Sequence, residues 1–167
     1  PEEVISEDGK KFFKKKNPSE IVTVGPIESM SKSKKNTVDP EKIIDNYGAD
    51  AVRLFILSDS PPEKDIQWSD QGIIASYKFI QKFWLLHKKI KNKFEEDSKT
   101  ENDIKLNKFT NQIIYKVNQS LDRFSYNTIV ASLHEIYNFY NKITEEKLQY
   151  DNLMNNYENI LKLMMPI

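Results

Sequence analysis

The sequence has no cysteine, only four glycines among its 167 residues, and no excess of charge of either sign. The missing cysteine excludes disulfides and thiolate metal sites and is compatible with a reducing cytosol. No apolar run approaches the roughly 18–20 residues of a membrane span. The 25 basic and 25 acidic residues cancel, so net charge does not indicate a nucleic-acid partner. We therefore expect a cytoplasmic protein whose function must be sought in local motifs.

The chain begins at Pro1, without an initiating methionine or a signal peptide, which indicates a piece of a longer protein. Residues 1–38 are β-like or irregular. Asp8-Gly9 is a favourable two-residue hairpin turn, and Ile21–Val24 is a short strand candidate. The polar stretch 29–37 lacks regular periodicity and predicts an exposed loop that ends this first region.

From residue 39 onward the pattern becomes helical and predicts a mainly α fold. Asp39-Pro40 provides an N-cap followed by proline in the first helical turn, and two short connecting helices are expected within 39–68. Residues 69–94 form one long helix, in which the aromatic positions Phe79 and Phe83 recur at helical spacing. Three more amphipathic helices follow, and their short connections predict an antiparallel helix bundle over 69–167, truncated at its C-terminus.

The most informative stretch is Met30-Ser31-Lys32-Ser33-Lys34-Lys35-Asn36. Its serine hydroxyls and backbone N–H groups can donate to phosphate oxygens, and its lysines supply mobile positive charge. A lysine-rich loop with these properties is more often a solvated linker, so composition alone does not decide between the two.

The order of motifs resembles class I aminoacyl-tRNA synthetases. Met30–Ser33 matches the last four positions of their KMSKS signature, and the residues that follow continue the family pattern through Asn36, Asp39-Pro40, Tyr47–Asp50 and Arg53. The next stretch, with Ser60–Asp65, Trp68–Asp70 and Gly72, resembles the bacterial type of leucyl-tRNA synthetase. By this resemblance, residues 1–38 are a remnant of the leucine-specific insertion and catalytic domain, and 69–167 resembles the helical anticodon-binding domain.

Two positions distinguish this chain from relatives. Ser29 replaces the first lysine of the signature, whereas the second lysine is present as Lys32. Lys35 stands where the isoleucyl, valyl and methionyl relatives usually carry glycine. The sequence thus retains the critical lysine, while the total charge of the loop is altered.

The resemblance implies a leucine–tRNA ligase that uses ATP and Mg²⁺ to form leucyl-adenylate and then charges tRNA(Leu). Lys32 is the expected catalytic residue, because it can meet charge that develops on the pyrophosphate. Met30, Ser31, Ser33 and Lys34 are the other expected ATP-binding residues. The leucine pocket and proofreading site are absent from these residues, so we expect this piece alone to be inactive.

Five basic residues are candidates for contacting tRNA: Arg53, Lys78, Lys82, Lys89 and Lys93. Helical geometry places the four lysines on one side, opposite the apolar stripe, and predicts that all four are exposed. The alternatives are a solvated helix face for the lysines and a structural ion pair for Arg53.

Other features have structural interpretations. Trp68 and Trp84 are expected to be packing anchors, and His87 and His134 lack metal-ligand spacing, so no metal site is expected. We expect a monomer. Two alternatives stay open at this stage: a non-catalytic helical RNA-binding module, and the equivalent piece of a sibling class I synthetase.

Overall fold

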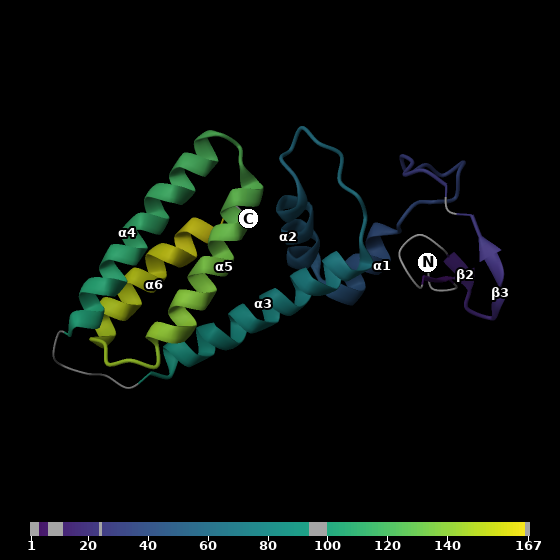
Figure 1. The fold of residues 1–167 in the computed structure, drawn as a ribbon. Coiled ribbons are helices and arrows are strands. Elements are labelled where there is room, and N and C mark those ends of the chain that lie inside the picture. The colour runs from purple at the N-terminus through teal and green to yellow at the C-terminus, as the bar shows by residue number, and fades with distance from the viewer. Residues whose placement is uncertain (1–3, 7–11, 24, 94–99, 166–167) are drawn as a thin grey trace. The chain divides into compact units, whose positions relative to one another are not determined.

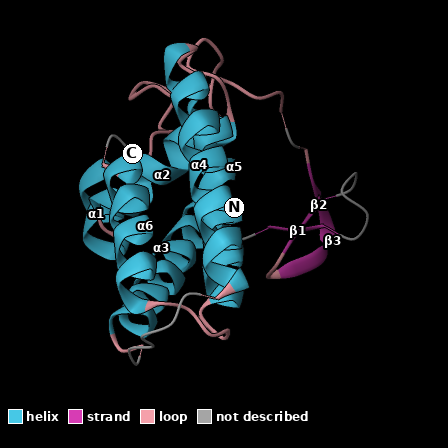
Figure 2. Ribbon diagram, turned by 90° about the vertical axis from the view of Figure 1, so that its left-hand side faces the viewer, coloured by secondary structure: helices cyan, strands magenta, loops and turns pink. Residues whose placement is uncertain are grey.

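The computed structural model describes residues 4–6, 12–23, 25–93 and 100–165 (Figure 1). These residues contain six helices and three strands, which confirms the mainly α fold class (Figure 2). The chain divides into two compact units, Pro1–Val38 and Asp39–Ile167. The second unit includes both the short helices and the long ones.

The first unit contains a small antiparallel sheet in the order β1-β2-β3. Its strands are β1 (Val4–Ser6), β2 (Phe12–Lys14) and β3 (Asn17–Val22). Ile5 pairs with Phe13 across the first two strands, while the turn predicted at Asp8-Gly9 lies outside the described residues. The strand expected at Ile21–Val24 begins earlier, at Asn17, directly after the turn that follows β2.

The second unit contains only helices in its described part. They are α1 (Pro40–Tyr47), α2 (Ala49–Asp59), α3 (Asp70–Lys91), α4 (Glu101–Asp122), α5 (Tyr126–Ile143) and α6 (Tyr150–Met164). The Asp39 side chain caps α1 by accepting from the Glu41 N–H at 3.2 Å. Gly48 ends α1 with φ +81°, a conformation that favours glycine, and its N–H donates to the Ile44 carbonyl at 2.7 Å.

A close contact between α2 and α3 forms the smaller apolar cluster. Ala51, Phe55 and Ile73 are its buried members. A Cβ atom added at Gly72 would lie 2.5 Å from the Phe55 ring, well inside van der Waals contact. The Phe55 ring in turn meets Trp68 edge-on, with centroids 5.3 Å apart. Glycine at position 72 therefore allows the two helices to approach this closely.

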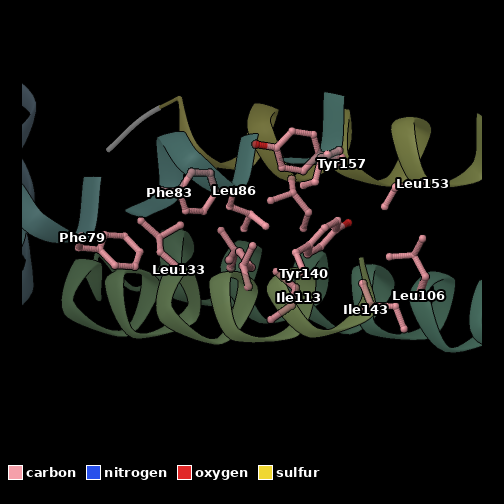
Figure 3. Close-up of a cluster of buried hydrophobic side chains, with 14 of the residues drawn as sticks. Phe79, Phe83, Leu86, Leu106, Ile113, Leu133, Tyr140, Ile143, Leu153 and Tyr157 are labelled. Atoms are coloured by element: carbon pink, nitrogen blue, oxygen red, sulfur yellow. The ribbon is translucent and has the colours of Figure 1, made fainter. Parts of the chain in front are cut away.

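The larger core lies among α3, α4, α5 and α6, and Figure 3 shows its side chains converging from these helices. Tyr140 and Tyr157 are fully buried at its centre, with ring centroids 5.6 Å apart. The Tyr140 hydroxyl lies 3.3 Å from the Thr110 hydroxyl, and burial raises the pKa of Tyr157 to about 12. The apolar stripe predicted for the long helix is buried as expected: Phe79, Phe83, Leu86 and Ile90. Each such side chain contributes roughly 1.5–3 kcal/mol to folding.

One buried carboxylate connects the start of α4 to the start of α6. Asp103 is 3% exposed and accepts from the Thr100 N–H at 2.7 Å and the Gln149 N–H at 3.1 Å. The Asn152 amide donates to it at 2.9 Å. Burial raises the pKa of Asp103, but the hydrogen bonds from Thr100, Asn152 and Gln149 outweigh burial and leave the pKa below its usual value.

The Asp103 contacts predict acid-dependent stability. Because the folded-state pKa is lowered, their contribution is present above the unfolded pKa of about 3.9 and is lost as pH falls through the folded pKa. Asp103→Asn places an NH₂ donor against N–H donors and should lower the free energy of unfolding at neutral pH by about 1–3 kcal/mol. Urea denaturation at several pH values measures both effects. Asp122→Asn, at an exposed position of the same helix, is the control; an equal loss in both variants would contradict the assignment.

Candidate phosphate-binding loop and lysine surface

The loop at residues 29–36 has a defined shape despite its exposure. The Asn36 side chain accepts from the Ser31 N–H at 2.8 Å and donates to the Ser29 carbonyl at 3.3 Å. The Ser31 hydroxyl lies 3.1 Å from the Ser33 hydroxyl and accepts from the Lys34 N–H at 3.3 Å. All five expected ATP-binding residues lie in this loop, on one short stretch between β3 and α1.

The lysines of the loop differ in their surroundings. Lys34 pairs with Glu28 at 2.8 Å. Lys35 has φ +52°, in the left-handed region that favours glycine, and its N–H donates to the Lys32 carbonyl at 3.2 Å. Lys32 is exposed, and no ion pair found within the described residues includes it. Lys35 therefore holds a backbone conformation that glycine would adopt without strain.

The described residues contain neither a metal-binding cluster nor a membrane-spanning helix. No group of three or more histidines or carboxylates there is arranged to hold a metal ion. No helix of that part is both long and apolar enough to cross a membrane.

Arg53 projects from α2 and pairs with Asp50, three residues earlier on the same helix. Both side chains are largely exposed, at 63% and 71%. An exposed pair of this kind contributes at most about 1 kcal/mol, so Arg53 can exchange its carboxylate partner for a phosphate at little cost.

The structure separates the four lysines that the sequence places on one exposed side. Lys78 and Lys82 are exposed as predicted, but Lys89 and Lys93 are half-buried, so the prediction of four exposed lysines is wrong for these two. Lys89 donates to the Asn141 carbonyl at 3.2 Å and pairs with Glu145.

The end of α5 explains this difference. Lys93 donates to the carbonyl of Thr144, the C-cap of α5, at 2.9 Å and to that of Glu146, in the turn just after it, at 2.6 Å. The last carbonyls of a helix lack intrahelical donors and carry partial negative charge, so they attract cations. The hydrogen bond and charge of Lys89 also lower the pKa of Glu145. Lys89 and Lys93 thus serve as cationic caps of α5.

Trp84 is 58% exposed, so the expectation that it is a packing anchor is wrong. Its ring stacks on His87 with centroids 5.3 Å apart, and the Lys88 ammonium lies 5.9 Å from the ring centroid. Trp84 lines an apolar groove together with Tyr157 and Met165. The apolar periodicity of α3 did not reveal this groove. The apolar face of α3 is wider than the part that the neighbouring helices cover, so Trp84 stays exposed at its edge.

Comparison with known proteins gives concordant results. A family model for the class I tRNA synthetases (I, L, M and V) matches residues 7–69. A leucine–tRNA ligase of Bartonella henselae is 40% identical over 144 residues, which is 83% of this chain and 16% of the relative. One from Rickettsia bellii is 40% identical over 168 residues, which is 99% of this chain and 20% of the relative.

The fold also has a solved counterpart. The crystal structure of a ternary LeuRS–tRNA–LeuAMS complex from Agrobacterium radiobacter K84 matches 82% of this chain and 19% of its own chain, with a TM-score of 0.72 at 24% sequence identity. At that identity the match supports the fold alone. The chain spans about a fifth or less of the length of its curated relatives.

The loop, the residues after it and the family match together define a segment of a class I aminoacyl-tRNA synthetase. Within that class, the relatives that align along most or all of the chain are leucine–tRNA ligases, so the chain corresponds to a segment of leucine–tRNA ligase. The resemblance drawn from the sequence is thereby confirmed.

The two pairs of lysines should differ in their effect on stability. Lys89→Gln with Lys93→Gln removes the cations from the end of α5 and should lower the free energy of unfolding by roughly 1–2 kcal/mol, after discounting for partial exposure. Lys78→Gln with Lys82→Gln is the matched control and should change it by less than about 0.5 kcal/mol. Chemical denaturation of the purified chain measures both, and equal effects would show that α5 does not need its cationic caps.

Proposed function

We propose that this chain is the part of a leucine–tRNA ligase that stabilises the ATP triphosphate during leucyl-adenylate formation and helps to hold tRNA(Leu). The observation that carries the proposal is the loop at residues 29–36, a signature match that folds into a hydrogen-bonded turn with Lys32 exposed. The 40% identity to leucine–tRNA ligases favours leucine over the amino acids of sibling enzymes.

Lys32 would act on the charge that develops on the leaving pyrophosphate. A cation that meets this charge only as the bond to the leaving group breaks lowers the barrier more than it strengthens ATP binding. Ser31, Ser33 and the backbone N–H groups of the loop would donate to phosphate oxygens. Lys34 would contribute after exchanging Glu28 for a phosphate, which an exposed ion pair permits at small cost.

ATP in such enzymes is used with Mg²⁺. The described residues contain no group of three or more carboxylates or histidines that could hold Mg²⁺ without the phosphates of ATP. Mg²⁺ is commonly held by substrate phosphates and one or two carboxylates. Leucine, ATP and tRNA(Leu) would meet in the full-length enzyme, which we propose to be a cytoplasmic monomer.

The helical unit would support tRNA as the start of an antiparallel bundle. Arg53, Lys78 and Lys82 are exposed and available to phosphates. Lys89 and Lys93 are already bound to the end of α5 and are the weaker candidates. The Trp84–Lys88 pair adds an exposed aromatic surface with a cation above it.

The role of Lys32 can be tested in the full-length enzyme. Lys32→Ala should lower leucine-dependent ATP–pyrophosphate exchange by roughly 10²–10³-fold, the usual scale for one transition-state donor. The KM for leucine should stay nearly unchanged, because the proposed role of Lys32 is toward the phosphates and not toward the amino acid. Lys108→Ala, at an exposed position of α4 outside the loop and the family motifs, is the control. Exchange that stays within a few-fold of the unmodified enzyme would contradict the role of Lys32.

The contribution of the exposed lysines can be tested separately. In the full-length enzyme, Lys78→Gln with Lys82→Gln should weaken tRNA binding and reduce the slope of log K against log salt by about 1–2, as expected for one or two lost phosphate contacts. Binding is measured by filter retention at several salt concentrations. An unchanged slope would assign both lysines to a solvated face and leave Arg53 as the better candidate.

A further inference from the structure

We propose that Asn36 is a positioning residue for adenylate formation, and that its side chain gives the loop the shape that presents Lys32. This inference rests on the proposed role of Lys32. We name the pair of hydrogen bonds from Asn36 to Ser29 and Ser31 the Asn36 bridge.

The Asn36 bridge closes the loop on itself. One amide group accepts from the Ser31 N–H and donates to the Ser29 carbonyl, so it joins the end of the loop to its beginning. A main-chain N–H can only donate and a carbonyl can only accept, so a single orientation of the amide satisfies both. A carboxylate cannot replace it, because it has no hydrogen to donate to Ser29.

The bridge fixes the short segment that carries Lys32. Ser31, held by the bridge, lies immediately before Lys32, and its hydroxyl accepts from the Lys34 N–H on the other side. The Lys35 N–H donates to the Lys32 carbonyl at 3.2 Å, and Lys35 has the left-handed conformation. The backbone is therefore tied on both sides of Lys32, while its ammonium group stays exposed.

The same geometry accommodates a serine at position 29. The bridge uses the carbonyl of Ser29 and does not use its side chain. Replacement of the usual lysine by serine at position 29 removes one cation but leaves the closure intact. All residues of the bridge are exposed or half-buried, so water can compete for its bonds and the loop can open to admit ATP.

The test is a double-mutant cycle in the full-length enzyme. Asn36→Ala should lower the rate constant of ATP–pyrophosphate exchange by roughly tenfold or more, because a misplaced catalytic group loses much of its effect. The KM for leucine should stay unchanged. Asn36→Asp keeps the size and one acceptor of Asn36, and should lose nearly as much activity as Asn36→Ala. Thr37→Ala, at the next exposed position, is the control.

The decisive result is the interaction between positions 36 and 32. If Asn36 acts through Lys32, then Lys32→Ala in an Asn36→Ala background should cost far less than it does alone. Independent, multiplicative effects, or an Asn36→Ala enzyme within about twofold of the unmodified one, would overturn the positioning role while leaving the proposed function intact. A full-activity Lys32→Ala enzyme would instead overturn the proposed function, and this inference with it.

Discussion

The placement of α6 against α4 rests on the buried carboxylate of Asp103. Asp103 gathers donors from three places: the residue before α4, the residue before α6, and the first turn of α6. Its desolvation costs free energy, but every one of these contacts is a hydrogen bond to the charged form, which offsets that cost. The contacts fix the start of α6 beside the start of α4. Two turns further along α6, Tyr157 meets Tyr140 in the core, so the apolar packing and the polar contact require the same helix placement.

The lysines of this chain differ in whether a protein acceptor lies within reach of the ammonium group. Lys89 and Lys93 lie beside the end of α5, where main-chain carbonyls accept hydrogen bonds from their ammonium groups. Lys78 and Lys82 lie two or three turns earlier on α3, away from that helix end, and remain in solvent. A lysine count along α3 therefore overstates the charge that an external phosphate would meet. The same distinction applies in the loop, where Lys34 pairs with Glu28 while Lys32 belongs to no ion pair among the described residues.

The parts of the fold that depend on local periodicity could be predicted from the sequence. Phe79, Phe83, Leu86 and Ile90 are buried as their spacing indicates, because a helix has one period whatever surrounds it. The contacts of Lys93 could not be predicted, since its partners lie 51 and 53 residues away. For the candidate site, the residue types in the loop indicated phosphate chemistry. The bridging role of Asn36 was not visible, because it depends on a backbone shape that brings residues 29, 31 and 36 together.

The contact between α2 and α3 restricts which substitutions positions 55 and 72 can accept. Gly72 sits where a single added methyl group would collide with the Phe55 ring, and that ring is buried and backed by Trp68. A larger residue at position 72 alone would collide with the Phe55 ring, and a smaller residue at position 55 alone would leave a cavity between the helices. A smaller residue at position 55 opens the space in which a larger one at position 72 becomes acceptable. Among homologous sequences, these two positions should therefore covary in volume, with the sum of the two side chains held nearly constant.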